Sequence, residues 1–394
     1  MLEFISLQTE IAWAAALLLA WLTAEYGYLK FKLPRISTYA VVGFVCGPAQ
    51  LGLLADATSE TPLLLANIAF GLLLFECGYR IHLRWLITNP WVGAAIVTEA
   101  LLTFIAVYGA ASWMNQSTTT SLLLATLSMA TSPATVVRVI AELRSSGQVT
   151  ERVLHHAVFN SGLAVLAFKF LLGLLVFNTS GSLLEATYSS LFVLAASVSL
   201  GALLGWVVPA FLRLTHRVHR DSTLAFTIAI LFLVALAHAL KLSPVLAALT
   251  FGVAARHRRI IMSPSQQGFG ALGDCLSVFL FVFIASKLDA SHVMSGIGLG
   301  LLIISVRLLA KVMGSVALAH ISGISLKKGA LIGMACAPFS AFVILVLEQT
   351  RHLGLSLVDQ LAPLAMAALV LEILGPLFVQ RALMWAHEIP DTKE

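Results

Sequence analysis

The stretch that decides the fold is "LSMATSPATVVRVI", residues 127–140. It is apolar enough to lie in a membrane, but Thr131, Ser132 and Pro133 interrupt it near the middle. Proline cannot donate a backbone hydrogen bond, and its ring clashes with the preceding helical turn. A serine directly before a proline is a favoured N-cap followed by a favoured first helical residue. The stretch therefore predicts a helix that stops inside the membrane and restarts at Pro133 or Ala134.

The composition of the chain indicates that this stretch belongs to a membrane protein. Of the 394 residues, 59% are hydrophobic and only 11% are charged. A soluble domain of this length could not keep so much apolar surface away from water. Windows of about 20 apolar residues recur along the chain and are typical of transmembrane helices. We predict an all-α polytopic membrane protein with about 13 spans. The predicted spans are roughly 11–29, 37–54, 62–80, 90–113, 119–137, 154–177, 188–214, 221–239, 243–256, 269–287, 291–319, 328–349 and 359–387.

Basic residues in the loops predict an orientation for these spans. If the N-terminus lies outside, the inside loops hold most of the 24 Lys and Arg residues, as the positive-inside rule requires. We therefore expect a bacterial inner-membrane protein, in contact with the lipid bilayer, with its N-terminus outside and its C-terminus cytoplasmic. The basic runs "RVHR" and "RHRR" then mark topology, so no nucleic-acid partner is expected.

Nothing in the sequence indicates an enzyme. Its four cysteines lie in apolar windows without paired spacing, which predicts neither a disulfide nor a zinc site. No metal-spaced histidine pair, nucleophile elbow or phosphate-binding loop is visible. We expect a protein without a metal or other cofactor.

A second interrupted span reads "GMACAPFSAFVIL", residues 333–345, with Gly333 and Pro338 inside it. Two ordinary proline kinks would be one explanation. However, each interrupted span is the middle one of a triplet, and the triplets cross the membrane in opposite directions. Paired broken helices in inverted repeats are typical of the substrate sites of secondary transporters. Their free ends leave backbone groups and partial charges at the bilayer midplane, which an ion or a charged side chain can bind.

Ionisable side chains inside the spans are candidate functional groups, since each costs roughly 2.5–3.5 kcal/mol near the bilayer centre. Arg307 and Lys311 share a helix face and repel each other, so we expect carboxylate partners, with Glu372 and Glu99 first. A structural ion-pair network is the alternative for Arg307 and Glu99. The candidates are Glu76, Glu99, Lys169, Arg307, Lys311 and Glu372.

Other charged or titratable groups in the spans are expected to have structural roles. Glu25, Asp274 and Glu348 lie near span ends and are expected at the interface. Lys169 is expected to extend along its helix towards water. The pair His155 and His156 is expected to cap the cytoplasmic start of the sixth span.

The chain resembles the monovalent cation:proton antiporters, a family of bacterial sodium/proton antiporters and potassium-efflux proteins. The resemblance covers about residues 33–380 and rests on several motifs in order. These are "LPRISTYAVVGFVCGPAQLGLL" (33–54), "FGLLLFECGYRIHLRWL" (70–86), "TSPATVVRVIAEL" (131–143), "LSPVLAALTFGVAARHRR" (242–259), "LSVFLFVFIASKLD" (276–289) and "LKKGALIGMACAPFSAFVILVL" (326–347).

The resemblance implies a fold and a mechanism. It implies core triplets at about 90–177 and 291–387, dimerisation or scaffold helices at about 11–80 and 221–287, and a linker helix at about 188–214. It also implies crossing broken helices, elevator-like alternating access and a homodimer. Lys311 corresponds to a basic residue that pairs with an ion-site carboxylate. No soluble C-terminal regulatory domain is expected after the last span.

The chain departs from the family pattern where the chemistry is expected. Relatives carry Asn-Asp or Asp-Asp on the sixth helix, and this chain has Asn160 and Ser161. A serine hydroxyl can ligate a cation but does not titrate near neutral pH. At 337–341, where a basic-glycine-acid cluster is common, this chain has "APFSA". Glu76 stands where relatives usually have an apolar residue.

The sequence thus predicts a secondary transporter, with Na⁺ or K⁺ and a proton as substrates and a displaced proton carrier. Glu372, Glu99 or Glu76 could be that carrier, or Lys311 could itself titrate. One alternative is a transporter of the same fold for an anion or small organic acid, favoured by Arg307 and by half-helix N-termini. The other is a non-transporting sensor or subunit on the same scaffold. The predicted site residues are Thr131, Ser132, Pro133, Asn160, Ser161, Arg307, Lys311, Pro338 and Ser340.

Overall fold

The computed structural model describes residues 2–54, 60–180, 183–215, 218–258, 268–290, 294, 296–343 and 361–390. Within these ranges the ordered elements are helices, and no strand occurs. Eight of the described helices are long and apolar enough to cross a membrane, and shorter apolar helices lie among them. The predicted all-α membrane class is confirmed, and the count of thirteen spans stays a prediction.

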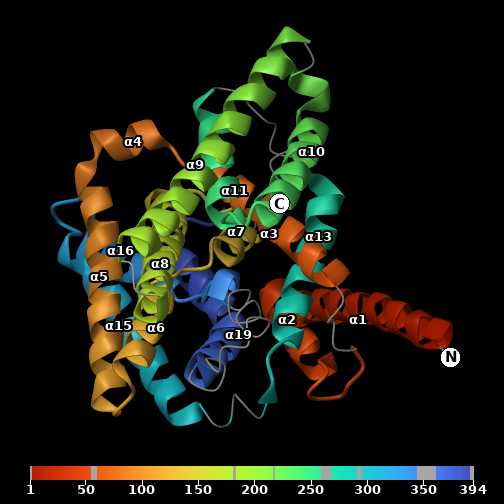
Figure 1. Ribbon diagram of the computed structural model, residues 1–394, viewed down its shortest axis with the longest axis horizontal. Helices are drawn as coiled ribbons and strands as arrows, with labels where there is room; N and C mark the ends of the chain where they lie inside the picture. The colour runs from red at the N-terminus through yellow and green to blue at the C-terminus, as the bar shows by residue number, and fades with distance from the viewer. Residues whose placement is uncertain are drawn as a thin grey trace.

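The helices follow the predicted spans along the chain (Figure 1). The first half contains α1 (Leu2–Phe31), α2 (Arg35–Cys46), α3 (Glu60–Arg80), α4 (Leu83–Thr88), α5 (Pro90–Trp113), α6 (Thr118–Ser128), α7 (Pro133–Leu143) and α8 (Gln148–Ser180). The second half contains α9 (Leu183–Leu214), α10 (Val218–Ala239), α11 (Pro244–His257), α13 (Gly270–Ser286), α15 (Ile297–Ala317), α16 (Leu326–Ala335) and α19 (Ala362–Trp385).

Both predicted interruptions are present. Helix α6 ends at Ser128, and α7 begins at Pro133, as its sequence predicts. The hydroxyl of Ser132 caps α7 by accepting a hydrogen bond from the backbone N–H of Thr135 at 3.2 Å. Helix α16 ends at Ala335, and residues 341–343 begin the next helical segment. The proline chemistry of each stretch therefore determined where its helix breaks.

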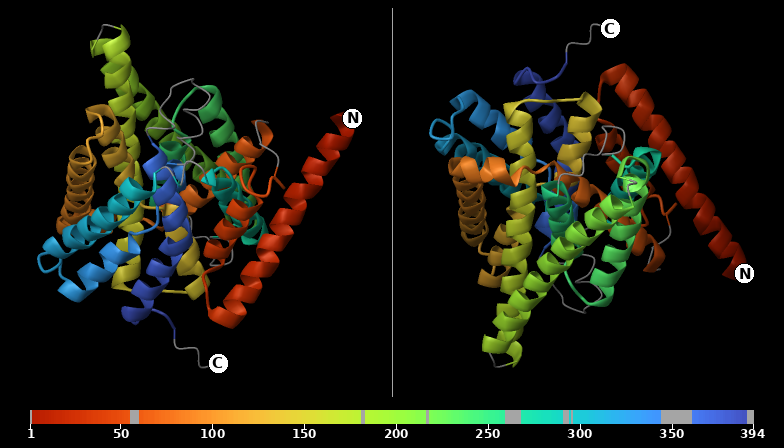
Figure 2. Two further views of the ribbon diagram at one scale, coloured as in Figure 1. Left: turned by 90° about the horizontal axis from the view of Figure 1, so that it is seen from below. Right: turned by 90° about the horizontal axis from the view of Figure 1, so that it is seen from above.

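The helices pack as two groups, which α19 connects together with the contacts of α8 with α9 and of α3 with α7. On one side α15 packs against α5 and α16, and α6 packs against α5 and α8. On the other side α11 packs against α3 and α9, and α2 packs against α1 and α13. Helix α19 contacts α15 and α16 in the first group and α2 in the second. Figure 2 shows α1 running as one long helix along an edge of the molecule.

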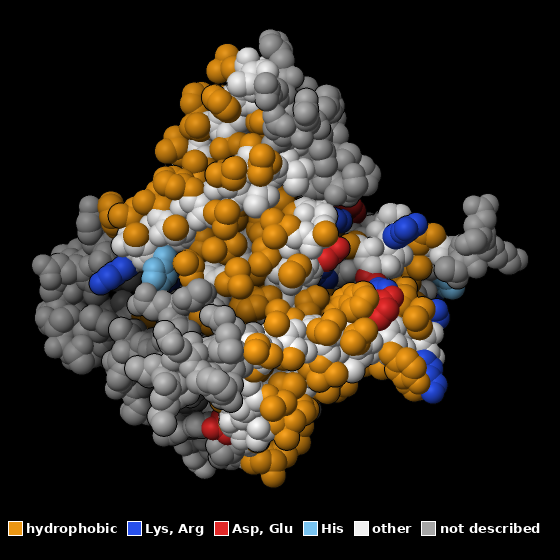
Figure 3. Space-filling model, turned by 90° about the vertical axis from the view of Figure 1, so that its right-hand side faces the viewer, with side chains coloured by type: hydrophobic (Ala, Val, Ile, Leu, Met, Phe, Trp, Pro, Cys, Tyr) orange, Lys and Arg blue, Asp and Glu red, His pale blue; other side chains and the backbone are white. Residues whose placement is uncertain are grey.

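Apolar side chains cover much of the outer surface, as expected of a protein surrounded by lipid. Hydrophobic groups spread across the face in Figure 3, and only a few charged groups interrupt them. On α1, for example, Ile11, Leu18, Trp21, Leu22 and Leu29 are each at least half exposed. Soluble monomers rarely expose contiguous apolar patches larger than a few hundred Å².

Two glycines let α3 and α11 approach closely. A Cβ atom added at Gly252 would overlap the carbonyl oxygen of Phe75, and one added at Gly78 would overlap that of Leu249. Small residues at such contacts are a main source of helix association in membranes, because packing rather than water release drives it. The sequence "FGVAARH" of α11 thus places a glycine where two backbones meet.

We expect Gly252→Ala to destabilise the protein by about 1–3 kcal/mol, the usual cost of overpacking a tight contact. Thermal melting of the detergent-solubilised protein would measure the loss. Gly109→Ala is the matched control, because a Cβ atom at Gly109 meets no atom within 4 Å. Equal melting temperatures for the two variants would contradict the close packing of α3 and α11.

Candidate ion-binding site

The two interruptions touch each other. The backbone N–H of Ser132 donates a hydrogen bond to the carbonyl of Pro338 at 3.1 Å. The hydroxyl of Thr131 donates to the carbonyl of Cys336 at 3.3 Å. All four residues are buried between the helix ends. The predicted meeting of the broken helices is confirmed, and it creates a polar centre inside an apolar protein.

Arg307 joins the ends of both broken helices. It lies on α15, and its side chain is fully buried. Its guanidinium group donates hydrogen bonds to five backbone carbonyls, at Ser128 (2.9 Å), Ala130 (2.7 Å), Ala337 (2.6 Å), Pro338 (3.3 Å) and Cys336 (3.5 Å). These carbonyls lie at or just after the C-terminal ends of α6 and α16, where carbonyls lack helical partners and the helix dipole is negative. The expectation of a carboxylate partner for Arg307 is therefore wrong, because helix ends supply the negative charge.

Lys311 forms an ion pair with Glu99 beside this junction. The Lys311 Nζ atom lies 2.6 Å from Oε1 of Glu99, and both side chains are fully buried. The same ammonium group donates to the Thr131 hydroxyl at 3.1 Å and to the Met129 carbonyl at 3.2 Å. Glu99 is one of the two carboxylates expected to pair with Lys311, and this contact is confirmed. Two buried charges so placed must compensate each other, because neither has water to solvate it.

The second carboxylate oxygen of Glu99 binds residues of α8. Asn160 Nδ2 lies 2.5 Å from Oε2, and His156 Nδ1 lies 3.2 Å from it. The expectation that His156 caps the start of its helix is wrong, because α8 begins about two turns earlier, at Gln148. His156 and Asn160 are four residues apart and share one face of α8. That spacing is the sequence signal that could have placed His156 at the site.

Ser161 bonds to Thr131 and not to Glu99. Its hydroxyl donates to the carbonyl of Thr131 at 2.6 Å and so binds the interrupted segment between α6 and α7. Asn160 Nδ2 also lies 3.3 Å from the Thr131 hydroxyl. Among the described residues, the Asn160 Oδ1 atom has no hydrogen-bond partner although it is buried. The cluster therefore contains one carboxylate, one ammonium group and a free amide oxygen.

The remaining candidates lie outside this cluster. Glu76 bonds to Arg80 at 2.8 Å, one turn along α3. Glu372 is buried on α19, and neither of its oxygens has a hydrogen-bond partner among the residues that the structure describes. Ser340 accepts a hydrogen bond from the backbone N–H of Phe342 at 3.4 Å, so it caps the segment after the second break. Glu348 falls outside the described residues.

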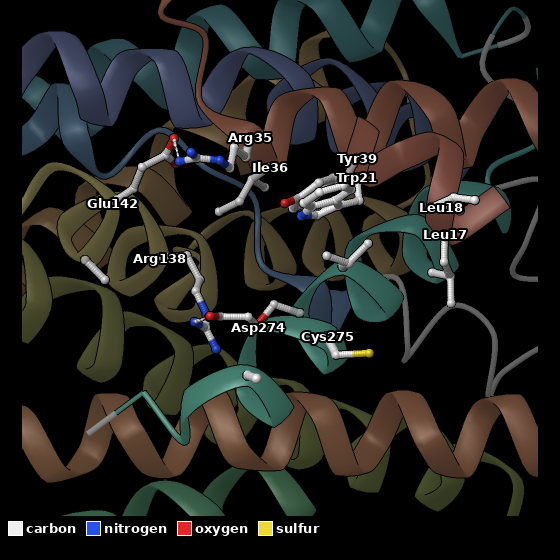
Figure 4. A pocket seen from close by; sticks show the side chains of 14 residues that line it. Leu17, Leu18, Trp21, Arg35, Ile36, Tyr39, Arg138, Glu142, Asp274 and Cys275 are labelled. Carbon is white, nitrogen blue, oxygen red and sulfur yellow. Dashed lines mark hydrogen bonds and ion pairs between the residues drawn. The ribbon is translucent and has the colours of Figure 1, made fainter. Parts of the chain in front are cut away.

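A cavity of about 770 Å³ lies apart from the cluster, between α1, α2, α7 and α13 (Figure 4). Two ion pairs line it, Arg35 with Glu142 at 3.0 Å and Arg138 with Asp274 at 2.7 Å. Most of the other lining side chains are apolar, and none of them belongs to the Glu99 cluster. The cavity thus does not reach the buried ion pair in this conformation.

Comparison with known proteins agrees with this architecture. The chain is similar in fold to the sodium proton antiporter MjNhaP1 from Methanocaldococcus jannaschii in two structures, both 18% identical in sequence. The structure at pH 8 has a TM-score of 0.67 and matches over 96% of this chain and 97% of that one. The structure from an electron microscopy map has a TM-score of 0.70 and matches over 95% of each chain.

The comparison with curated proteins found no match. A family described as "Sodium/hydrogen exchanger, transmembrane" matches residues 14–385, which is nearly the whole chain. This chain therefore belongs to the transmembrane sodium/hydrogen exchanger family.

Proposed function

We propose that this protein exchanges a monovalent cation for a proton and that Glu99 replaces the carboxylate that relatives carry on the sixth helix. The observation that carries the proposal is the buried pair of Lys311 and Glu99, 2.6 Å apart beside the contact between the broken helices. Exchange requires a site that holds either a proton or a cation at one time. A carboxylate for which an ammonium group and a metal cation compete meets that requirement.

The oxygens around Glu99 suit a small hard cation. The carboxylate supplies charge, and the free Oδ1 of Asn160 and the hydroxyl of Thr131 lie in the same cluster. Oxygen atoms are the ligands that hard cations prefer. Ser161 supports this arrangement by holding the Thr131 carbonyl, but its hydroxyl cannot carry the exchanged proton.

The exchange follows from competition at Glu99. Without a cation, Lys311 keeps its proton and neutralises the carboxylate. A cation that binds to the carboxylate, Asn160 and Thr131 neutralises the charge of Glu99. The protonated form of Lys311 then loses its stabilising partner, so Lys311 releases its proton. In the reverse step Lys311 binds a proton again, and the cation leaves the site. Movement of the core triplets against the scaffold helices, within an inner-membrane homodimer, would carry either form across.

An anion substrate has less support. That alternative relied on Arg307 and Lys311 as free positive groups. Arg307 instead donates to five backbone carbonyls, and Lys311 is paired with Glu99. An anion would have to break these contacts and would meet the carboxylate of Glu99.

Proton flux in proteoliposomes with an imposed pH gradient tests the proposal. We expect Na⁺ or K⁺ to collapse the gradient with saturation, and we expect Lys311→Ala to lose this response because the proton carrier is gone. Li⁺ is tested alongside to compare ion sizes. A wild-type protein that inserts in the membrane but responds to none of the three cations would contradict the proposal.

A further inference from the structure

A cysteine adjoins the cluster around Glu99. The thiol of Cys336, the Nδ1 or Nε2 atom of His156 and a carboxylate oxygen of Glu99 all lie within 4.8 Å of one another. The three residues come from three separate segments, namely α5, α8 and the break after α16. All three are buried. The sequence could not show this group, because the positions are 57 residues apart or more along the chain.

The three ligand atoms fit a metal centre after a small movement. Zinc lies about 2.0–2.3 Å from nitrogen, oxygen and sulfur ligands in a tetrahedral site. Ligands at those distances are separated by roughly 3.3–3.8 Å, so the spacing between the three ligand atoms would contract by about 1.5 Å or less. Side-chain rotation about the two χ angles of His156 or the three of Glu99 can supply such a shift.

Asn160 adjoins the same cluster and offers a fourth ligand if its amide group turns. The Nδ2 atom of Asn160 donates to Glu99, and its Oδ1 atom is buried without a hydrogen-bond partner among the described residues. A turn of the amide group would exchange the positions of the two atoms. A buried carbonyl oxygen without a partner carries a cost that a cation ligand would remove. The cluster thus offers sulfur, nitrogen and two oxygens.

We propose that this cluster binds a thiophilic divalent cation of the Zn²⁺ and Cd²⁺ class, through Cys336, His156, Glu99 and Asn160. Thiolate and imidazole ligands select borderline and soft metals, whereas Na⁺ and K⁺ prefer oxygen. Coordination replaces the proton of the Cys336 thiol, which leaves to solvent. The inference deepens the proposed function, because the divalent cation would occupy the carboxylate that the monovalent cation needs. Competition between the divalent cation and exchange therefore rests on the proposed function, whereas metal binding itself does not.

The other cysteines provide controls. Cys77 is also buried, but its thiol donates to the Pro133 carbonyl at 3.3 Å. Among the described residues it belongs to no group of potential metal ligands. Cys275 is exposed and can bind metal loosely without a built site. The measurement is therefore made on full-length protein that carries Cys275→Ser.

The experiment is a Cd²⁺ titration of the purified protein in detergent, followed by the ultraviolet charge-transfer absorption of the thiolate–cadmium bond. We expect a band that saturates near one Cd²⁺ per chain and that remains in Cys77→Ser. Cys336→Ser should abolish the band, and His156→Gln should weaken binding at least about 10-fold, as loss of one ligand or its support commonly does. Elution as a single species checks that each variant is folded.

The outcomes separate this inference from the proposed function. No saturable band in the Cys275→Ser protein, or an equal band after Cys336→Ser, would overturn the metal site. Cd²⁺ binding that depends on Cys336, in a protein without cation:proton exchange, would support the metal site while the proposed function fails. Cd²⁺ binding together with competitive loss of Na⁺-driven exchange would support both.

Discussion

Replacing Glu99 by glutamine should abolish cation:proton exchange while the protein still inserts in the membrane. The glutamine side chain has nearly the shape of glutamate but is neutral, so it cannot balance the charge of a bound cation or form an ion pair with Lys311. We expect the initial rate of Na⁺- or K⁺-driven proton flux to fall at least about 100-fold, equivalent to ~2.8 kcal/mol at 1.4 kcal/mol per factor of ten. The measurement is the proteoliposome assay described for the wild-type protein.

Three variants make this result specific to Glu99. Glu372→Gln changes a buried carboxylate that lies outside the cluster, and exchange should persist. Ser161→Ala removes one hydrogen bond to Thr131, worth about 1 kcal/mol, and should reduce exchange only several-fold. Glu99→Asp keeps the charge and should restore part of the flux. Wild-type exchange by Glu99→Gln, with loss in Glu372→Gln, would assign the essential carboxylate to α19 instead of α5.

Replacing Arg307 by methionine should have the largest effect on stability. Its guanidinium group bonds to five carbonyls at two helix ends. Methionine would remove this donor, and only the carbonyls of Cys336 and Pro338 would keep the bonds they accept from Thr131 and Ser132. Each buried carbonyl that loses its donor costs about 1–3 kcal/mol, and several carbonyls lose theirs in this variant. We expect a markedly lower melting temperature in detergent and little monodisperse protein.

Two further arginine variants test this explanation. Arg307→Lys should recover only part of the stability, because one ammonium group cannot span both helix ends as a planar guanidinium does. Arg138→Met is the control, because Arg138 bonds only to the exposed Asp274 and to the Gly273 carbonyl at 2.8 Å and should lose less stability than Arg307→Met. If Arg307→Met melts at the wild-type temperature, the helix ends do not depend on Arg307.

The pairing of Lys311 with Glu99 shows how far sequence reasoning reaches into the site. A lysine within a span needs an anionic partner, and few acidic residues lie within spans, so few candidates remain. The same reasoning fails for Arg307, because backbone carbonyls can replace a carboxylate and leave no mark in the sequence. His156 is also missed, although its spacing of four residues from Asn160 was a usable signal. Cys336 is missed because no pattern around it points to the site, which it joins only where separate helices converge.

The sequence by itself determined the membrane class and the two helix breaks, because both depend on local chemistry. Apolar composition excludes a soluble fold, and Ser132 with Pro133 ends one helix and starts another regardless of distant contacts. Only the tertiary structure decided which carboxylate meets Lys311. That choice depends on how α5 packs on α15, where a Cβ atom at Gly314 would lie 2.5 Å from the Cα of Glu99. Because glycine permits this close approach, Glu99 reaches Lys311, and no local pattern in either helix specifies that distance.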